Sequence, residues 1–162
     1  MKRAFRMVPV VVAAASLAAL IAGSGAAKTS PTVTFHLVEK DLTFHFVDNP
    51  PIGGQNQPPS PGDEFVFTSE LLTRAGKHAG MLRAVCHATE GGQTGALTCF
   101  GTFGLKGGQL EGMVTIRGES RRQHIAIVGG TGVYVGVRGE VVSVDRGENS
   151  PFTDDTFRLF KP

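Results

Sequence analysis

Glycines that follow a run of β-branched residues late in the chain are the first candidates for chemistry. Val128-Gly129-Gly130-Thr131-Gly132 has the start of a dinucleotide-binding loop, in which free N–H groups at a helix start bind a pyrophosphate. Val135 occupies the position of the third glycine, and the valine-rich residues that follow favour a strand over a helix. The segment therefore predicts a tight turn between two antiparallel strands, with glycine where φ must be positive.

Histidine and serine motifs do not point to metal or hydrolase chemistry. The chain has five histidines, but it has no His-x-His sequence of the kind that a cupin-type metal site needs. It also has no Gly-x-Ser-x-Gly elbow for a nucleophilic serine. We therefore expect no metal site and no Ser-His-Asp hydrolase.

The first 27 residues have the pattern of a secretory signal peptide, with a basic start, an apolar run and the small residues Gly25-Ala26-Ala27. The apolar run is short for a membrane span, so we expect its removal, no stable membrane anchor and a secreted, extracellular protein. Removal takes away three of 16 basic and none of 14 acidic residues, which leaves a net charge near −1. This balance argues against nucleic acid as a partner. Residues 28–162 are expected to form one domain.

The two cysteines lie on predicted strands on either side of a glycine-containing turn. If Cys86 stands opposite Cys99, the same register places Leu82 opposite Phe103 on one apolar face. In an oxidising compartment this arrangement predicts a cross-strand disulfide, which would add about 3 kcal/mol of stability. A reactive thiol or a redox pair is the alternative interpretation.

Alternation of apolar and polar residues is typical of strands along most of the mature chain. The number and spacing of these segments predict an antiparallel barrel or sandwich without a long helix. The first two segments form either one long broken strand or two short ones. The predicted strands are 32–39, 41–47, 63–72, 77–89, 97–105, 109–117, 124–128, 136–145 and 153–160.

Two polar side chains fall where they could contact a ligand. Ser69 shares the apolar face of Phe67 and Leu71, where its hydroxyl either bonds to the backbone or faces a cavity. Tyr134 is the only tyrosine and follows the glycine turn. Its ring either packs at a rim of the fold or donates a hydrogen bond to a substrate.

Several short motifs resemble, in the same order, those of the allene oxide cyclase and dirigent protein family. The most specific is the glycine-rich segment Ala126 to Gly132 with Tyr134, followed by Arg138-Gly139. Together the motifs span most of residues 32–160. The resemblance implies an eight-stranded antiparallel β-barrel and trimeric assembly. The other motifs are Gly62-Asp63 with Phe67-Thr68, Lys77 to Gly80, Cys86, and Gly108-Gln109-Leu110.

The resemblance also implies a function. The cyclases of this family close an allene oxide into a cyclopentenone, and dirigent proteins steer the coupling of phenoxy radicals. Neither needs a metal or an organic cofactor, because the barrel holds one conformer of a flexible, oily substrate. We therefore expect a small hydrophobic ligand and no cofactor. If the protein is an enzyme, the resemblance implies an isomerase of the intramolecular cyclase type.

Candidate site residues follow from the same resemblance. Ser69 stands where the cyclases have an asparagine, and Cys86 matches a cavity cysteine; with Phe67 and Tyr134 they form the expected ligand pocket. Glu39 lies at about the distance before Gly62-Asp63 that separates the cyclases' catalytic glutamate from their Gly-Asp, which makes it the candidate catalytic residue. Asp41 is either its polar partner or part of a solvated bend at 39–41.

Three hypotheses from different classes follow. A cyclising or isomerising barrel predicts an apolar cavity lined by phenylalanine, with one or two carboxylates inside. A non-catalytic ligand-binding module predicts the same cavity without a convergent acid. A structural extracellular barrel predicts an interior packed solid with side chains. The volume of the interior and the direction of Glu39 and Ser69 separate the three.

Overall fold

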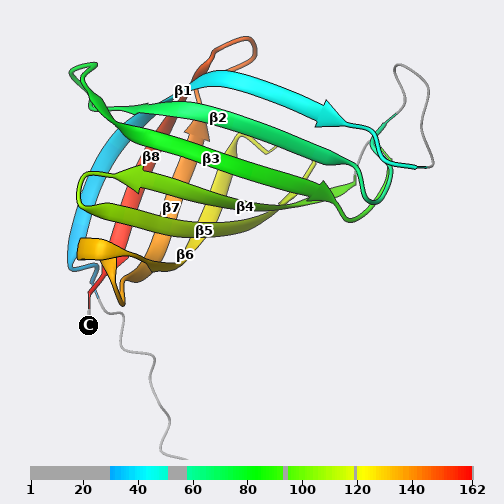
Figure 1. The fold of residues 1–162 in the computed structure, drawn as a ribbon. Helices are drawn as coiled ribbons and strands as arrows, with labels where there is room; N and C mark the ends of the chain where they lie inside the picture. Colours follow the sequence, from blue (N-terminus) through cyan, green and yellow to red (C-terminus); the bar gives the residue numbers. More distant parts are fainter. Residues whose placement is uncertain (1–29, 51–57, 93–94, 119, 162) are drawn as a thin grey trace, which may run out of the picture.

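Alternating residues build eight strands in the computed structural model, which describes residues 30–50, 58–92, 95–118 and 120–161. Each strand pairs antiparallel with the next and β8 pairs with β1, so the sheet closes on itself (Figure 1). The expected eight-stranded antiparallel β-barrel is confirmed. The strands are β1 Val33–Val47, β2 Glu64–Leu72, β3 His78–Ala88, β4 Ala96–Leu105, β5 Gly108–Arg117, β6 Arg122–Gly130, β7 Arg138–Asp145 and β8 Phe152–Phe160.

The predicted signal peptide, residues 1–27, lies outside the described residues. Within the described ranges, no helix has the length and apolar character needed to cross a membrane.

The first strand is one long strand with an irregularity. Its pairing with β2 shifts register between Asp41 and Thr43, while its first half also pairs with β8. A register shift of this kind bends a strand and increases its twist. The alternative of two short strands is therefore wrong, and the predicted break corresponds to the bulge.

The cysteine register is confirmed. Cys86 pairs with Cys99, and Leu82 pairs with Phe103 on the same face. The two cysteines form a disulfide and are buried, with 3% and 5% of their surface exposed. The interpretation as a reactive thiol is wrong for this structure, and the disulfide joins β3 to β4.

The glycine-rich segment lies at one end of the barrel, which we call the closed end because the apolar core fills it. A single 3-10 turn, η1 Gly132–Tyr134, follows β6. The strand that we expected over 136–145 follows it as β7 and begins at Arg138. The Val133 N–H donates to the Gly107 carbonyl at 3.0 Å, so this segment lies directly on the β4–β5 turn. A phosphate-binding helix start is absent from the described chain here.

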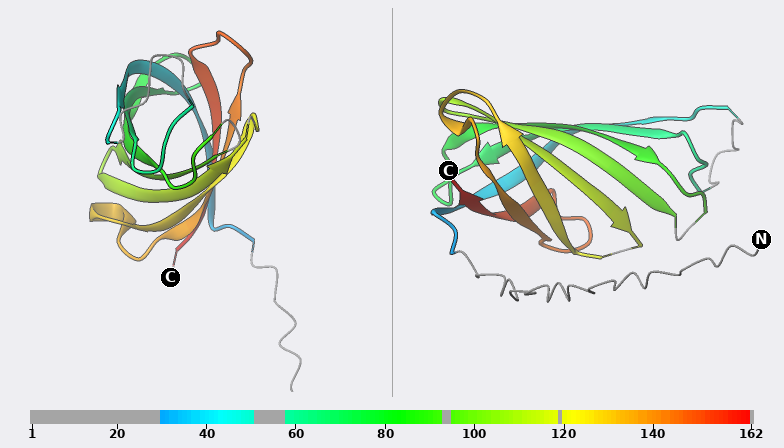
Figure 2. Two further views of the ribbon diagram at one scale, coloured as in Figure 1. Left: turned by 90° about the vertical axis from the view of Figure 1, so that its right-hand side faces the viewer. Right: turned by 90° about the horizontal axis from the view of Figure 1, so that it is seen from below.

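Apolar side chains fill the barrel next to this closed end. Phe103 packs edge-on against Phe157 with ring centroids 5.2 Å apart, and Phe35 stacks on Phe157 at 4.5 Å. Viewed along the barrel, the strands form a ring around this core (Figure 2). Burial of these side chains supplies the main driving force for folding. The core consists of Leu37, Leu71, Leu82, Phe103, Leu110, Ile127, Val137, Val141, Phe157 and Leu159.

We predict that Gly132→Ala destabilises the protein by at least about 2 kcal/mol in urea unfolding. Gly132 has a φ of +59°, and a Cβ there would overlap the carbonyl of Gly107. Gly129→Ala is the matched control, because a Cβ at Gly129 meets no atom within 4 Å among the described residues. Equal midpoints for the two variants would show that the close approach does not constrain the fold.

Candidate functional site

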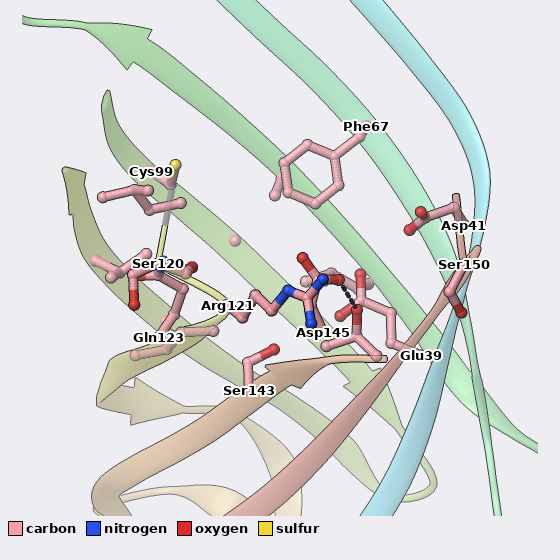
Figure 3. A pocket seen from close by; sticks show the side chains of 18 of the residues that line it. Glu39, Asp41, Phe67, Cys99, Ser120, Arg121, Gln123, Ser143, Asp145 and Ser150 are labelled. Carbon is pink, nitrogen blue, oxygen red and sulfur yellow. Dashed lines mark hydrogen bonds between the residues drawn. The ribbon is translucent and has the colours of Figure 1, made fainter. Parts of the chain in front are cut away.

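A cavity of about 800 Å³ occupies the part of the barrel beyond the apolar core (Figure 3). Because the strands alternate, one residue in two points into it. Strands β2 to β6 give it an apolar wall, and β1, β7 and β8 give it a polar one. The apolar wall includes Phe67, Leu82, Ala84, Phe103, Val114, Ile116 and Ile125, and the polar wall includes Glu39, Asp41, Ser143, Asp145 and Thr153.

Glu39 lies in the middle of β1 and is only 8% exposed. Glu39 is therefore not part of a solvated bend, whereas Asp41, at the register shift, is exposed. Burial raises the pKa of Glu39 to about 8; the negative charge of Asp155 adds to this effect, and Ser69 opposes it. Close to neutral pH, this carboxyl group can hold a proton and release it. Such a group can act as a general acid or base.

Asp155 is the buried neighbour of Glu39 on β8. It is 1% exposed, and neither of its carboxylate oxygens has a hydrogen-bond partner among the described side chains and backbone. Burial raises its pKa to about 7, which the polar neighbours Ser143 and Glu39 partly oppose. Two carboxyl groups this close disfavour a double negative charge, so they titrate as a pair.

Two hydroxyl groups extend the polar wall beside this pair. The Ser69 hydroxyl, fully buried, donates to Asp41 Oδ1 at 3.4 Å, so it faces the carboxyl groups and not the backbone. Burial also raises the pKa of Asp41. Thr153 donates to Asp145 Oδ1 at 3.2 Å. Acids and hydroxyls thus lie side by side on four neighbouring strands, β7, β8, β1 and β2, although Ser69 itself does not line the cavity.

The remaining predicted pocket residues have different positions. Phe67 lines the cavity from β2, the strand next to the one that carries Glu39 and Asp41. Cys86 does not line it, although its disulfide partner Cys99 does. Tyr134 packs against the apolar core, and its hydroxyl donates to the Lys106 carbonyl at 3.3 Å. It therefore lies at the closed end, away from the cavity.

Sequence reasoning missed the acids on the last two strands. Asp155 has the same strand parity as Phe157, and Asp145 has the same parity as Val141. This alternation was the available signal, because an acid in phase with core residues points inward. Arg121, which extends into the cavity from its rim in Figure 3, comes from a connection that carries no such pattern.

Beyond Lys40, β1 no longer pairs with β8 and continues beside β2 (Figure 1). Phenylalanines lie on this part of both strands. Phe46 and Phe44 pair with Phe65 and Phe67, so all four share the inner face. Phe44 and Phe46 are 64% and 46% exposed, and both rings contact Phe65. The inner face of β1 and β2 thus continues the apolar wall outward as an aromatic surface.

Several solved protein structures have the same fold, and their names denote enzymes and a dirigent protein. A pyocyanin demethylase matches with a TM-score of 0.66 at 24% identity, over 78% of this chain and 99% of its own. The pterocarpan synthase dirigent protein PsPTS1 matches with a TM-score of 0.63 at 17% identity, over 83% and 100%. The Diels-Alderase AbmU from Streptomyces koyangensis matches with a TM-score of 0.59 at 17% identity, over 80% and 64%.

The chain shares its fold with dirigent proteins and cyclising enzymes. At these identities the likeness establishes the barrel alone. No protein-family model and no curated protein sequence matches the chain. The chemistry must therefore be argued from the cavity.

We predict that stability falls as the pH rises from about 4.5 to about 8. The pKa of Glu39 is raised to about 8 and that of Asp155 to about 7, so the folded state binds more protons than the unfolded chain over this range. The stabilisation is complete below the unfolded pKa values and is lost as each folded pKa is passed. Urea unfolding at several pH values measures this slope.

Glu39→Gln should flatten the slope and make the variant more stable than the wild type at pH 8, because the amide carries no charge to bury. Glu111→Gln, on β5 and outside the cavity lining, is the control and should keep the slope. An unchanged slope in Glu39→Gln would refute the buried titration.

Proposed function

We propose that the protein is a secreted barrel of the allene oxide cyclase and dirigent type, which binds a small, largely apolar molecule and directs its cyclisation or isomerisation. The observation that carries this proposal is a cavity of about 800 Å³ that has an apolar wall and is lined by the buried carboxyl group of Glu39. A cavity of this size suits a small molecule, and a few polar groups suffice to orient it. Restricting a flexible substrate to one conformer lowers the entropy cost of ring closure.

Glu39 is the proton-transfer group in this proposal. With a pKa of about 8, it can take a proton from one position of the bound substrate as a carboxylate and return a proton to another position of the rearranged product. Protons and electrons balance, as an isomerisation requires. The burial of Glu39 raises its pKa, and the negative charge of Asp155 raises it further, so Asp155 acts as a positioning residue.

Secretion is part of the proposal. The buried Cys86–Cys99 disulfide fits an oxidising compartment, as does the signal-peptide pattern of residues 1–27. Trimeric assembly, which the family resemblance implies, stays a prediction.

The structural alternative requires an interior packed solid, which the cavity contradicts. The non-catalytic alternative uses the same cavity. It differs from the proposal only in having no turnover.

We predict that Val114→Phe abolishes ligand binding. Val114 lines the cavity, so the added ring occupies ligand space. Met113→Phe is the matched control, because the neighbouring side chain is 41% exposed on the outside of the barrel. Native mass spectrometry of the secreted protein, incubated with lipid and phenolic extracts, measures retained mass. Adducts on both variants would contradict the proposal. The absence of adducts on the wild type and on both variants would also contradict it.

We predict that Glu39→Gln retains the ligand but loses turnover. The amide has the shape of the acid, but it does not take up or release a proton near neutral pH. Chiral chromatography of the product from the retained ligand measures conversion and the excess of one stereoisomer. Unchanged conversion in Glu39→Gln refutes this role. Binding without conversion in the wild type favours the non-catalytic module.

A further inference from the structure

The inner carboxyl groups of the barrel lack positive partners, unlike the outer ones. On β8, the outward-facing Asp154 forms an ion pair with Arg146 at 2.7 Å, whereas the next residue, Asp155, faces inward. On β7, the Glu140 carboxylate pairs with both His124 and Arg158. Over the described ranges, no such ion pair exists for the four inner acids, Glu39, Asp41, Asp145 and Asp155.

Asp155 provides an independent observation. Its side chain is 99% buried, and both of its oxygens lack a hydrogen-bond partner in the described part of the chain. Its neighbours Glu39 and Ser143 both line the cavity. Burying an unpaired carboxyl group costs several kcal/mol unless a partner compensates for it. Asp155 itself does not line the cavity, so a ligand meets Glu39 and Ser143 first. Positive charge placed beside them would compensate for the buried acids.

Aromatic rings beside the acids also suit a cation. Phe67 lines the cavity from β2, the strand next to β1, and the inner face continues outward over Phe65, Phe44 and Phe46. Faces of aromatic rings attract cations and also bind apolar carbon. One basic side chain, Arg121, is among the described lining residues, and it forms no ion pair with the inner acids.

We infer that the ligand is an organic cation, with an apolar or aromatic body against β2 to β5 and a positively charged nitrogen against the acids of β1, β7 and β8. This inference rests on the proposed function and specifies its substrate class. The cation supplies the charge that the inner acids lack. Neutral ligands leave the acids protonated, and anions are repelled once the acids ionise.

Binding of a cation is linked to proton release. Glu39 holds a proton near neutral pH and is stabilised as a carboxylate when a positive charge lies beside it. Affinity for a cation therefore rises with pH until Glu39 is ionised in the free protein. The groups that face Glu39 from the surrounding elements are Asp41, Asp145, Asp155, Ser69 and, from the rim, Arg121.

Three acridines of similar shape test the inference with the full-length secreted protein. 9-Aminoacridine is cationic between pH 7 and 9, acridine is neutral and acridine-9-carboxylate is anionic. Fluorescence titration should give an affinity for the cation at least about tenfold above that for the neutral probe, with the anion weakest. The advantage of the cation should grow from pH 7 to 9. Calorimetry in buffers of different ionisation enthalpy should show proton release with the cation alone.

Variants locate the effect. Asp155→Asn and Glu39→Gln should reduce the advantage of the cation, whereas Asp154→Asn, on the outside of β8, should retain it. Val114→Phe should abolish binding of every probe, which places binding in the cavity. Because calorimetry uses the wild-type protein, a variant that fails to fold leaves the test intact.

The outcomes separate the two proposals. If the neutral acridine binds in the cavity as tightly as the cation, without proton release from either, the inference is overturned and the proposed function stands. If the cation does not bind while an extract ligand is retained, the inference is likewise overturned and the proposed function stands. If neither an acridine nor an extract ligand is retained, both proposals fail.

Discussion

Closure of the sheet between β1 and β8 is the constraint on which the site depends. This pairing places Glu39 opposite Thr153 and Leu37 opposite Asp155, so residues from the two ends of the domain share one wall. Without closure, the inner face of β1 would be open to water, and Glu39 would have an ordinary carboxyl pKa. The buried acids and the barrel therefore form together, and the chemistry of the site is a property of the closed fold.

The barrel interior is divided along its length and around its circumference. Apolar side chains fill the closed end, where η1 lies on the β4–β5 turn, and they supply the burial energy. The acids lie beyond this core and on one side only. Burying carboxyl groups lowers stability, and a stable core can offset that cost. Perturbed acids beside a cavity are the arrangement expected of a functional site, because a purely structural interior has no use for them.

Much of the fold could be predicted from the sequence, since alternation with a period of two determines which residues face inward. The cysteine pairing fixed the β3–β4 register for the same reason. The same alternation places Asp155 on the inner face with Phe157. An inward-facing carboxylate conflicts with the usual preference for apolar residues inside, so Asp155 was not predicted as a site residue. The end of the barrel at which Tyr134 lies could not be predicted. Alternation along a strand indicates which face of the sheet a residue is on, but not its position along the barrel axis. The length of η1 depends on contacts with Gly107, which are distant in sequence.

The motifs that carry the family resemblance lie mostly where they shape the barrel. The glycine-rich segment packs backbone against backbone at the closed end. Asp63, just before β2, accepts hydrogen bonds from the N–H groups of Asn49 and Ser60 at 2.9 and 2.7 Å. Such motifs report a shared container. A demethylase, a dirigent protein and a Diels-Alderase share the fold at 17% to 24% identity to this chain, so the fold by itself does not specify a reaction. In this chain, acids of β1 and β7 line the cavity and form no ion pair among the described residues, and the proposal of a cationic ligand rests on their charge.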